Sequence, residues 1–291
     1  MKKVSRRNFL KVSGAMAAAG ALAACGGSGA STPAASGAAS TSTAASVAAA
    51  GEDKFASLGD FTMTVGHAQP EGNPRFVSME QFAADVAEAT NGHVKIEVYG
   101  NGQLGTEKEM LEQVVAGTVQ GMRGGQFDFS PRLLMFTLPF LTNTRAQVTA
   151  LLQSDLAQKV CAEAEGETGT VIINLCDAGG YRQFSNSKHP IKAPADLKGL
   201  KMRTNGMKTI DMTFQAMGAT TTTIPYSDLY MGLKTGVADG QENPWVNVEG
   251  MKFYEVQKYF TEVNYQFHPD PFYVNAAWWN GLPEEYRDII T

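Results

Sequence analysis

The sequence predicts an α/β fold in which helices cover a mainly parallel sheet. Patterns typical of strands and helices alternate from residue 61 onward, as they do in chains that build parallel sheets. The folded body begins near Leu58 and is roughly 230 residues long. A body of that length can bury the cores of two modest lobes.

The first two strands and the helix between them follow from spacing and capping residues. Apolar and polar residues alternate over residues 61–65 and again over 94–98, which predicts two strands with one apolar face each. Asn73 followed by Pro74 is typical of a helix start, because proline suits the first helical position. Gly92 marks the end of that helix.

A second helix is predicted from a capping box. Thr106 and Glu109 have the spacing at which two side chains cap each other's backbone N–H groups. The helix should run through Val115 and end at Gly117.

The rest of the body continues the same alternation. Further strands are expected at residues 170–175, 181–185, 199–203, 219–224 and 272–279. Further helices are expected at residues 144–164, 209–217, 226–234 and 244–254, with a last one opened by Pro283. The sequence contains no internal repeat.

Residues 1–25 are interpreted as an export signal. Four basic residues open it, namely Lys2, Lys3, Arg6 and Arg7, and a short apolar stretch follows over residues 10–24. That stretch is too short to remain as a membrane-spanning helix. Residues 5–11 resemble a twin-arginine signal, the address of the exporter for folded proteins. Residues 22–25 resemble a bacterial lipobox, in which Cys25 is lipidated and becomes the new N-terminus.

Residues 26–57 should form a flexible tether between the lipid and the folded body. Nearly all of them are Gly, Ser, Ala or Thr, which offer little apolar surface to bury.

The charge of the mature chain restricts its partners. Five of the 24 basic residues lie in the export signal, so 19 remain against 29 acidic residues, a formal net charge of −10. Such a balance argues against nucleic acid or an anionic membrane surface as the partner. An anionic ligand would need a locally positive pocket.

Cysteines and histidines give no sign of a metal site. Cys161 and Cys176 remain after Cys25, and they could form a disulfide in an exported chain or stay as two buried thiols. The four histidines are scattered without ligand spacing, so no metal is expected.

Residues 100–105 match the pattern G-x-G-x-x-G between a strand and a helix, the context of a dinucleotide fingerprint. However, the match follows the second strand, and the position about 20 residues further on is Gln120, where an acidic residue would bind the ribose. Together with the twin-arginine signal, this motif supports an alternative hypothesis, an exported NAD(P)-dependent oxidoreductase.

Arg182 and Arg203 are candidates for binding an anion. Each lies on or at the end of an expected strand, from which a guanidinium could point into a cleft. The planar fork of arginine can donate two parallel hydrogen bonds to one carboxylate. Taken alone, an arginine in such a place is more often part of a surface ion pair.

Several sequence motifs then occur in a fixed order. They are Gly-Tyr-Arg-Gln-Phe-Ser-Asn at 180–186, Asp-Leu-Lys-Gly-Leu-Lys-Met-Arg at 196–203, Asp-Leu-Tyr at 228–230, Gly-Val-Ala-Asp-Gly-Gln-Glu-Asn-Pro at 236–244 and Phe-Tyr-Glu-Val-Gln-Lys-Tyr at 253–259. Upstream, Gly-Gln-Leu-Gly at 102–105 and Leu-Pro-Phe-Leu at 138–141 are also similar. Together they resemble the extracytoplasmic solute-binding subunits of TRAP (tripartite ATP-independent periplasmic) transporters, of the dicarboxylate-binding type. The resemblance covers residues 61–290.

The resemblance implies three polar contacts in the second lobe. Arg203 matches the arginine that pairs with the ligand carboxylate in this family, and Arg182 matches a second arginine that often assists. Asn243 matches an asparagine that hydrogen-bonds the same carboxylate.

Further contacts follow with a looser match. Tyr226 falls where the family places an aromatic ring against the ligand, and Gln126 and Gln69 lie near first-lobe positions that contact polar groups of the ligand. The segment 122–126 departs from the usual pattern. Arg123 within it is either a third cation of the pocket or a solvated charge.

We therefore expect a two-lobe fold like that of periplasmic binding proteins, with a hinge and a ligand cleft between the lobes. Lobe 1 should hold residues 58–179 with a return over 269–291, and lobe 2 residues 180–268. Members of the family usually continue with more helix after the position of Thr291.

The expected function follows from the same resemblance. Anchored through Cys25 in the periplasm or on the outer face of the cell membrane, the protein should capture a small organic carboxylate. It should deliver this ligand to integral-membrane TRAP subunits. It should work as a monomer, without a cofactor and without catalysing a reaction.

Overall fold

The computed structural model describes residues 53–291. The expected export signal, Cys25 and nearly all of the expected tether lie outside these residues. Within them, no helix combines the length and the apolar character needed to cross a membrane.

Eight strands form one mixed sheet in the described part of the chain, in the order β2-β1-β3-β8-β4-β7-β5-β6. The strands are β1 (Phe61–Gly66), β2 (Val94–Tyr99), β3 (Gly121–Arg123), β4 (Thr170–Asn186), β5 (Lys201–Thr204), β6 (Thr220–Thr223), β7 (Gly240–Pro244) and β8 (Tyr259–Asn275). Pairing is parallel among β2, β1 and β3 and among β7, β5 and β6. It is antiparallel wherever β4 or β8 takes part. The expectation of a mainly parallel sheet is therefore right for both outer groups of strands and wrong for the centre.

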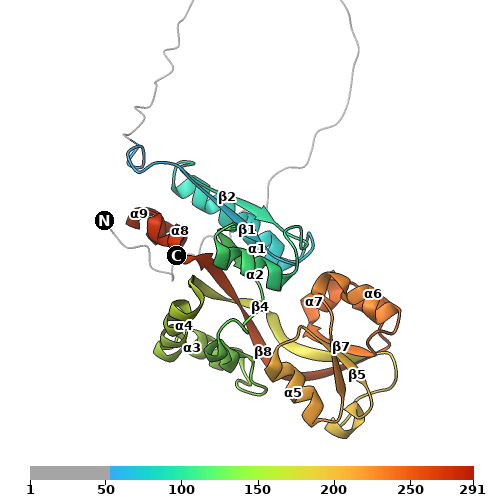
Figure 1. The fold of residues 1–291 in the computed structure, drawn as a ribbon. Helices are drawn as coiled ribbons and strands as arrows, with labels where there is room; N and C mark the ends of the chain where they lie inside the picture. Colours follow the sequence, from blue (N-terminus) through green and yellow to red (C-terminus); the bar gives the residue numbers. More distant parts are fainter. Residues whose placement is uncertain (1–52) are drawn as a thin grey trace, which may run out of the picture. The chain divides into compact units, whose positions relative to one another are not determined.

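The central strands β4 and β8 are 17 residues each and pair with each other over nearly their whole length. In Figure 1 they run side by side as the two longest arrows. Strand β4 joins the two strands expected at 170–175 and 181–185 into one. The sequence pattern breaks there because Gly179 and Gly180 have positive φ values of 113° and 97° inside an irregular stretch of pairing.

The expected lobe boundaries coincide with this irregular stretch. Asp177 pairs with Pro269 and Tyr181 with Phe267, so the boundaries near residues 179 and 268 lie opposite each other on neighbouring strands. A register shift with two left-handed glycines is a natural place for backbone bending. The lobe division itself stays a prediction.

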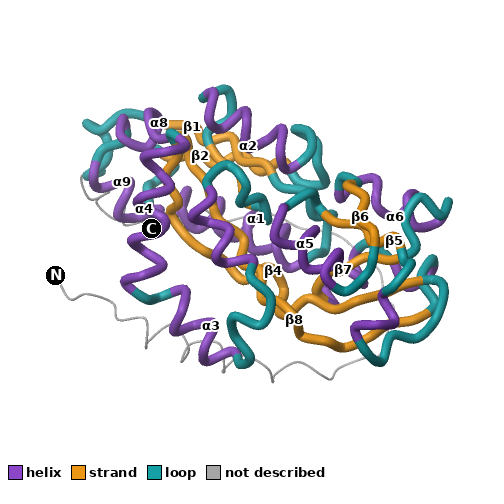
Figure 2. The backbone as a smooth tube through the Cα atoms, turned by 60° about the horizontal axis from the view of Figure 1, so that its bottom comes forward, coloured by secondary structure: helices purple, strands orange, loops and turns teal. Residues whose placement is uncertain are grey.

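The helices lie on either side of the strands, as the purple and orange segments of Figure 2 show. They are α1 (Pro74–Ala89), α2 (Glu107–Ala116), α3 (Arg145–Leu152), α4 (Asp155–Thr168), α5 (Lys208–Ala216), α6 (Leu229–Lys234), α7 (Trp245–Gly250), α8 (Ala276–Gly281) and α9 (Glu284–Ile290). The long helix expected at 144–164 is two helices, because the Ser154 side chain caps a new helix by accepting from the N–H of Ala157.

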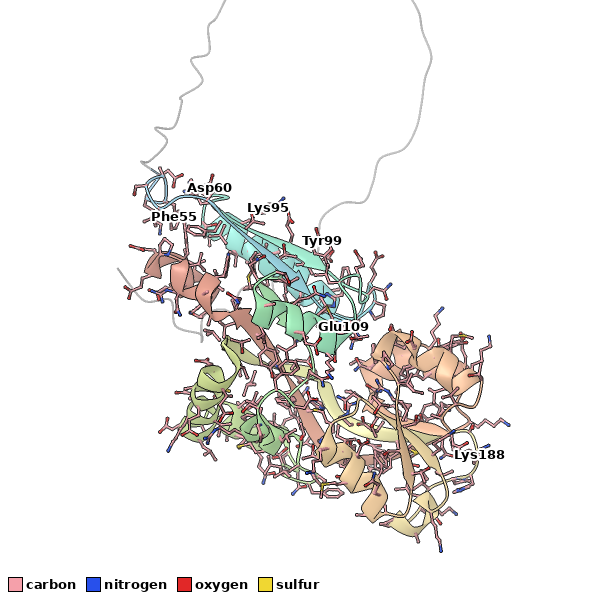
Figure 3. The ribbon with its side chains drawn as sticks, viewed as in Figure 1. Phe55, Asp60, Lys95, Tyr99, Glu109 and Lys188 are labelled. Atoms are coloured by element: carbon pink, nitrogen blue, oxygen red, sulfur yellow. The ribbon has the colours of Figure 1, made fainter. Side chains whose placement is uncertain are left out.

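The expected helix starts are confirmed. The Asn73 side chain accepts a hydrogen bond from the N–H of Arg75 at the start of α1. At the start of α2, Thr106 and Glu109 form the reciprocal capping box, with Glu109 at the helix end labelled in Figure 3. Gly117 ends α2 with a φ of 78°, in the left-handed region that glycine adopts without strain.

One expected strand was misplaced at the C-terminal end, and one helix there was not expected. The strand expected at 272–279 is the second half of β8, which begins at Tyr259, and residues 276–281 form α8 instead. The Asn275 side chain stops the strand and starts the helix, because it accepts a hydrogen bond from the N–H of Trp278. The short strands β3 and β7 were not expected, since all their residues are buried and no alternation marks them.

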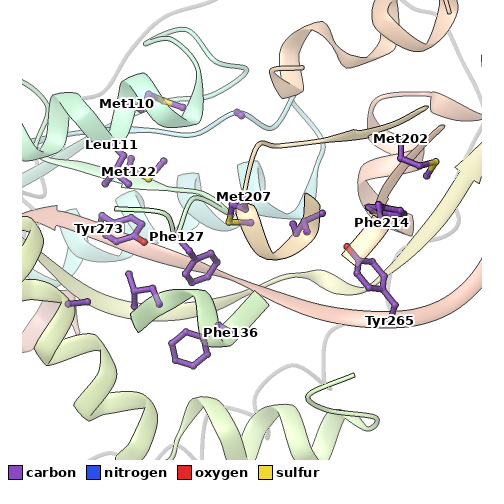
Figure 4. Close-up of a cluster of buried hydrophobic side chains, with 14 of the residues drawn as sticks. Met110, Leu111, Met122, Phe127, Phe136, Met202, Met207, Phe214, Tyr265 and Tyr273 are labelled. Atoms are coloured by element: carbon purple, nitrogen blue, oxygen red, sulfur yellow. The ribbon is translucent and has the colours of Figure 1, made fainter. Parts of the chain in front are cut away.

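A buried hydrophobic cluster reaches across the central strands. Met122 and Tyr273 belong to it, and so do Met202, Phe214 and Tyr265 (Figure 4). Because residues of both expected lobes share this core, β4 and β8 connect the two halves through packing as well as through the backbone.

Both cysteines of the described part of the chain are free thiols. Cys161 is buried and Cys176 is half-buried. Burial raises the pKa of Cys161 to about 11, so its thiol stays protonated at neutral pH.

Candidate functional site

A cavity of about 330 Å³ lies where several strands end. Part of its lining comes from the start of α2 and from the loops or strand ends after β3, β5 and β6. These parts contribute four charged residues, one amide and one aromatic residue, namely Glu107, Lys108, Gln126, Asp128, Arg203 and Tyr226. In open α/β sheets, ligands bind beyond the carboxyl ends of the strands, and this cavity has that position.

Arg203 is the buried cation of the cavity. It lies in β5 with 2% of its surface exposed, and its Nε donates a hydrogen bond of 2.8 Å to the carbonyl of Ile224. No hydrogen bond joins its Nη1 or Nη2 to an acceptor among residues 53–291, and no carboxylate oxygen in that range lies within 4.0 Å of its nitrogens. Two donor nitrogens of a buried guanidinium are therefore left for a ligand.

The electrostatic cost of this arrangement is visible in the pKa of Arg203, which burial lowers to about 10. The carboxylates of Glu242 and Glu107 act in the opposite direction, while the neighbouring charge of Arg182 adds to the lowering. A buried cation in this condition favours an added anion, because the anion would replace the water that the guanidinium has lost.

Arg182 is equally buried but has a carboxylate partner inside the protein. Its Nε and Nη2 donate to the two carboxylate oxygens of Glu242, the second bond being 2.8 Å long. The hydroxyl of Tyr265 donates to the same carboxylate at 2.7 Å. Burial alone would lower the pKa of Arg182, but the charge of Glu242 outweighs it and raises that pKa.

Asn243 lies beside this pair in β7, and its side chain is bonded within the protein. Its Nδ2 donates to Oε1 of Gln241 at 2.6 Å, and its Oδ1 accepts from Arg182 and from Asn247 at 3.3 Å each. Neither Arg182 nor Asn243 lines the cavity of Arg203.

Tyr226 and Gln126 do line the cavity, and Gln69 lies behind it. The hydroxyl of Tyr226 donates to Oε1 of Gln69 at 3.0 Å. The Nε2 of Gln126 donates to Oδ1 of Asp128 at 2.6 Å. The structure thus brings three of the six predicted site residues, Arg203, Tyr226 and Gln126, to one cavity. Gln69 is one hydrogen bond away.

Arg123 is neither a cation of this cavity nor a solvated charge. It is 8% exposed, and its guanidinium donates to Oγ of Ser78 at 2.8 Å and to the carbonyl of Asp177 at 3.1 Å. With Arg75 it lines a separate cavity of about 360 Å³, next to Gly179.

The sequence interpretation missed three charged residues of the site, Glu107, Lys108 and Asp128. Glu107 is the first residue of α2 and pairs with Nη1 of Arg75 at 3.1 Å. The capping box at Thr106 was a usable signal, because it places a helix start directly after a strand and a turn. The capping box could not show which strands end next to the start of this helix.

The glycine-rich turn at residues 100–105 serves packing. A Cβ on Gly100 would lie 2.2 Å from the ring of Phe76, so only glycine fits there. After the turn, the Glu109 carboxylate accepts from the N–H of Thr106 at the start of α2. A dinucleotide would need its pyrophosphate at that helix start, where two carboxylates, Glu107 and Glu109, would repel it. The turn therefore does not support the oxidoreductase alternative.

A second cavity of about 350 Å³ has a mostly apolar lining, including Phe184, Leu197 and Tyr265. Its two charged lining residues, Lys192 and Glu262, are exposed. An anion there would find no buried cation in the lining, so the smaller cavity of Arg203 is the better candidate for an anionic ligand.

Comparison with known proteins now adds the family. Residues 65–291 match the profile of the bacterial extracellular solute-binding proteins, family 7. Residues 3–23 match the signal sequence of the twin-arginine translocation pathway, which confirms the predicted export route.

Two curated relatives show how far the likeness extends. The chain is 36% identical to an uncharacterized protein, y4mM, of Sinorhizobium fredii over 72% of this chain and 39% of that protein. It is 31% identical to the C4-dicarboxylate-binding periplasmic protein DctP of Rhodobacter capsulatus over 76% of this chain and 67% of that protein. The matched region thus spans well under half of the first relative and about two thirds of the second.

A solved structure supports the same assignment. A TRAP periplasmic solute-binding protein from Desulfovibrio salexigens, with bound orotic acid, is 33% identical and superposes with a TM-score of 0.75 over 79% of this chain and 74% of that chain. This likeness confirms the predicted two-lobe α/β fold. Because the family profile matches more than half of its length, the chain belongs to the bacterial extracellular solute-binding proteins of family 7, of the TRAP type.

Proposed function

We propose that the protein captures a small organic carboxylate in the cavity of Arg203 and delivers it to the membrane subunits of a TRAP transporter. The observation that carries the proposal is a buried guanidinium with two donors and no carboxylate partner in the described part of the chain. The named relative and the solved neighbour bind a C4-dicarboxylate and orotic acid respectively, both of which are carboxylic acids.

The physical reason is desolvation. A carboxylate that enters a closed cavity loses its water and needs charge-assisted hydrogen bonds in return. Arg203 already suffers the desolvation of its own charge, and its Nη1 and Nη2 can donate to both oxygens of one carboxylate. Binding therefore stabilises both charges at once.

The proposed roles of the other predicted site residues follow from their positions relative to the cavity. Tyr226 and Gln126 line the cavity and are proposed to contact the body of the ligand. Gln126 belongs to the first expected lobe and Arg203 to the second, so a ligand between them would favour closure about the irregular stretch near Gly179. Arg182, Asn243 and Gln69 are proposed to join only through closure, because their polar groups are bonded within the protein here.

The role ends with binding and delivery. The relatives with assigned names are binding proteins, and we propose that this chain likewise catalyses no reaction, uses no cofactor and works as a monomer. Its net negative mature charge suits neither nucleic acid nor anionic lipid as a partner.

Export and anchoring are separate parts of the proposal. The matched twin-arginine signal directs the chain out of the cytoplasm, and we propose that Cys25 then carries the lipid that holds it at the membrane. Cys25→Ala should move the protein from the membrane fraction to the soluble fraction of fractionated cells. Wild-type protein that is soluble and carries no lipid would contradict the anchor.

The decisive experiment on the site is Arg203→Lys, with affinity measured by titration calorimetry for the best acid from a thermal-shift screen. Lysine keeps the charge but loses the planar fork, so affinity should fall by about 1.5–3 kcal/mol, or about 10- to 150-fold. The matched control is Arg132→Lys, the same exchange at a half-exposed arginine that pairs with Glu163 and Glu167. Equal affinity in both variants would move the site away from Arg203.

A further inference from the structure

The cavity of Arg203 is lined by two cations and two carboxylates. The cations differ in burial. Arg203 is buried, whereas Lys108 is exposed. The two carboxylates, Glu107 and Asp128, come from the first expected lobe. The part of a ligand that points away from Arg203 would therefore meet carboxylates and one solvated ammonium.

Glu107 has one oxygen available to a ligand. Its Oε1 accepts from Nη1 of Arg75 at 3.1 Å, and no hydrogen bond from residues 53–291 reaches its Oε2. Its side chain is 17% exposed, so this carboxylate is shielded from most of the solvent but open to the cavity. It lies close enough to Arg203 to raise the pKa of that guanidinium against the larger lowering by burial.

Asp128, on the loop after β3, is exposed and also has one oxygen without a hydrogen-bond partner among the described residues. Its Oδ1 accepts from Nε2 of Gln126 at 2.6 Å, and no donor in the described range is bonded to its Oδ2. The first expected lobe thus offers two acceptor oxygens, on Glu107 and Asp128, to the same cavity.

Arg75 and Arg123, two further buried arginines, line the separate cavity next to Gly179 and not the cavity of Arg203. Arg75 pairs with Glu107 and, at 2.5 Å, with Asp270, and Arg123 lies 4.0 Å from the same aspartate. A second carboxylate on the ligand would therefore find no second buried cation in the lining of this cavity. The ammonium of Lys108 and the carboxylate of Asp128 are both exposed and screened by solvent, so the half-buried carboxylate of Glu107 decides the balance against a second carboxylate.

We propose that the ligand is a monocarboxylate that carries hydroxyl groups, with its carboxylate on Arg203 and its hydroxyls donating to Glu107 and Asp128. Hydroxyl groups suit these acceptors, because a carboxylate accepts hydrogen bonds strongly and repels another carboxylate. This inference rests on the proposed function and narrows it, since it makes a dicarboxylate the disfavoured ligand.

The test uses three six-carbon probes that differ only away from one carboxylate. Gluconate has hydroxyls and one carboxylate, glucarate has hydroxyls and a second carboxylate, and hexanoate has one carboxylate without hydroxyls. In titration calorimetry at pH 7.5, gluconate should bind at least roughly tenfold more tightly than either of the others. A matched four-carbon set of threonate, tartrate and butyrate repeats the comparison for a smaller ligand.

Asp128→Asn and Glu107→Gln connect the preference to these residues. Each exchange removes a charge and keeps an acceptor, so each should weaken the hydroxy monocarboxylate by roughly 3- to 10-fold and narrow its advantage over the matching dicarboxylate. Asp128 is exposed, so its substitution should leave folding intact. Glu112→Gln, an exposed position of α2 that does not line the cavity, is the control and should change neither affinity.

The outcomes separate this inference from the proposed function. If a dicarboxylate binds as tightly as its hydroxy monocarboxylate, or if hexanoate does, and Arg203→Lys still weakens binding, the inference is wrong and the function stands. If Arg203→Lys leaves the affinity for every acid unchanged, both are overturned. If none of the six probes binds while another acid from the screen binds in a way that depends on Arg203, the inference is wrong and the function stands. A preference for the hydroxy monocarboxylate that Asp128→Asn and Glu107→Gln both leave unchanged also overturns the inference.

Discussion

Two regions of the second expected lobe each contain a buried arginine. In one region a carboxylate of the protein pairs with the arginine, and in the other no carboxylate within residues 53–291 does. Arg182 in β4 is 6% exposed and paired through two nitrogens with Glu242. Arg203 in β5 is 2% exposed, and among the described residues only a backbone carbonyl accepts from it. The pKa of Arg182 is raised by its partner, while burial lowers the pKa of Arg203 to about 10.

The difference shows how a buried arginine can serve either the stability of the fold or the binding of a ligand. At Arg182 the carboxylate belongs to the protein, so the charge is satisfied when the chain folds. At Arg203 the carboxylate is missing from the fold, and the desolvated guanidinium faces a cavity. A ligand can supply to Arg203 the carboxylate partner that Glu242 supplies to Arg182. The following experiments test whether the two regions differ in this way.

The largest effect is expected from Arg182→Met. Removing one partner of a buried pair leaves the Glu242 carboxylate without its cation, so the free energy of unfolding should fall by about 3–5 kcal/mol in urea titrations. The double variant Arg182→Met/Glu242→Gln removes both charges and keeps an acceptor for Tyr265, and it should recover most of that loss.

The same exchange at Arg203 is the contrasting control. Arg203→Met removes a buried charge without a carboxylate partner, so the stability of the ligand-free protein should change by no more than about 1 kcal/mol. A loss as large as that of Arg182→Met would show that Arg203 is also a structural group, and the contrast between the regions would disappear.

A smaller effect is expected from raising the pH. A carboxylate binds the protonated guanidinium, and the proton leaves Arg203 as the pH rises through its pKa of about 10. Affinity should therefore be constant between pH 7 and 9 and fall about tenfold for each pH unit above 10. Calorimetry at pH 8 and 11 checks this, with circular dichroism to confirm that the protein stays folded.

The Arg182 pair should not contribute to that loss, because its pKa is raised rather than lowered. Affinity that stays flat to pH 11 would mean that the charge of Arg203 is better satisfied than its burial indicates. It would place Arg203 in the same class as Arg182.

Local features of the fold were predictable because their causes are local. The capping box of Thr106 and Glu109 and the cap by Asn73 each depend on residues within one helical turn, and both are confirmed. Strand β4 was divided in two because Gly179 and Gly180 interrupt the pattern, whereas long-range pairing with β8 continues the strand through them. Strand β7 carries no alternation, since it is buried throughout.

The sequence predicted the cation of the candidate site but not the acidic residues around it. The order of sequence motifs pointed to Arg203, and the structure places that residue in a cavity with Tyr226 and Gln126. Glu107 and Asp128 escaped notice because they become site residues only when α2 and the loop after β3 face the end of β5. The spacing of residues in the sequence does not predict that these three segments lie together.

By itself the sequence determined the capped starts of α1 and α2, most strands, the export signal and the family, because each depends on neighbouring residues or on motifs in a fixed order. Only the tertiary structure decided which of the two arginines keeps its donors for a ligand. Glu242 lies 60 residues from Arg182, and strand pairing between β4 and β7 brings them together. No carboxylate oxygen within residues 53–291 comes within 4.0 Å of the nitrogens of Arg203, because β5 ends at a cavity whose acidic lining residues, Glu107 and Asp128, stay beyond that distance.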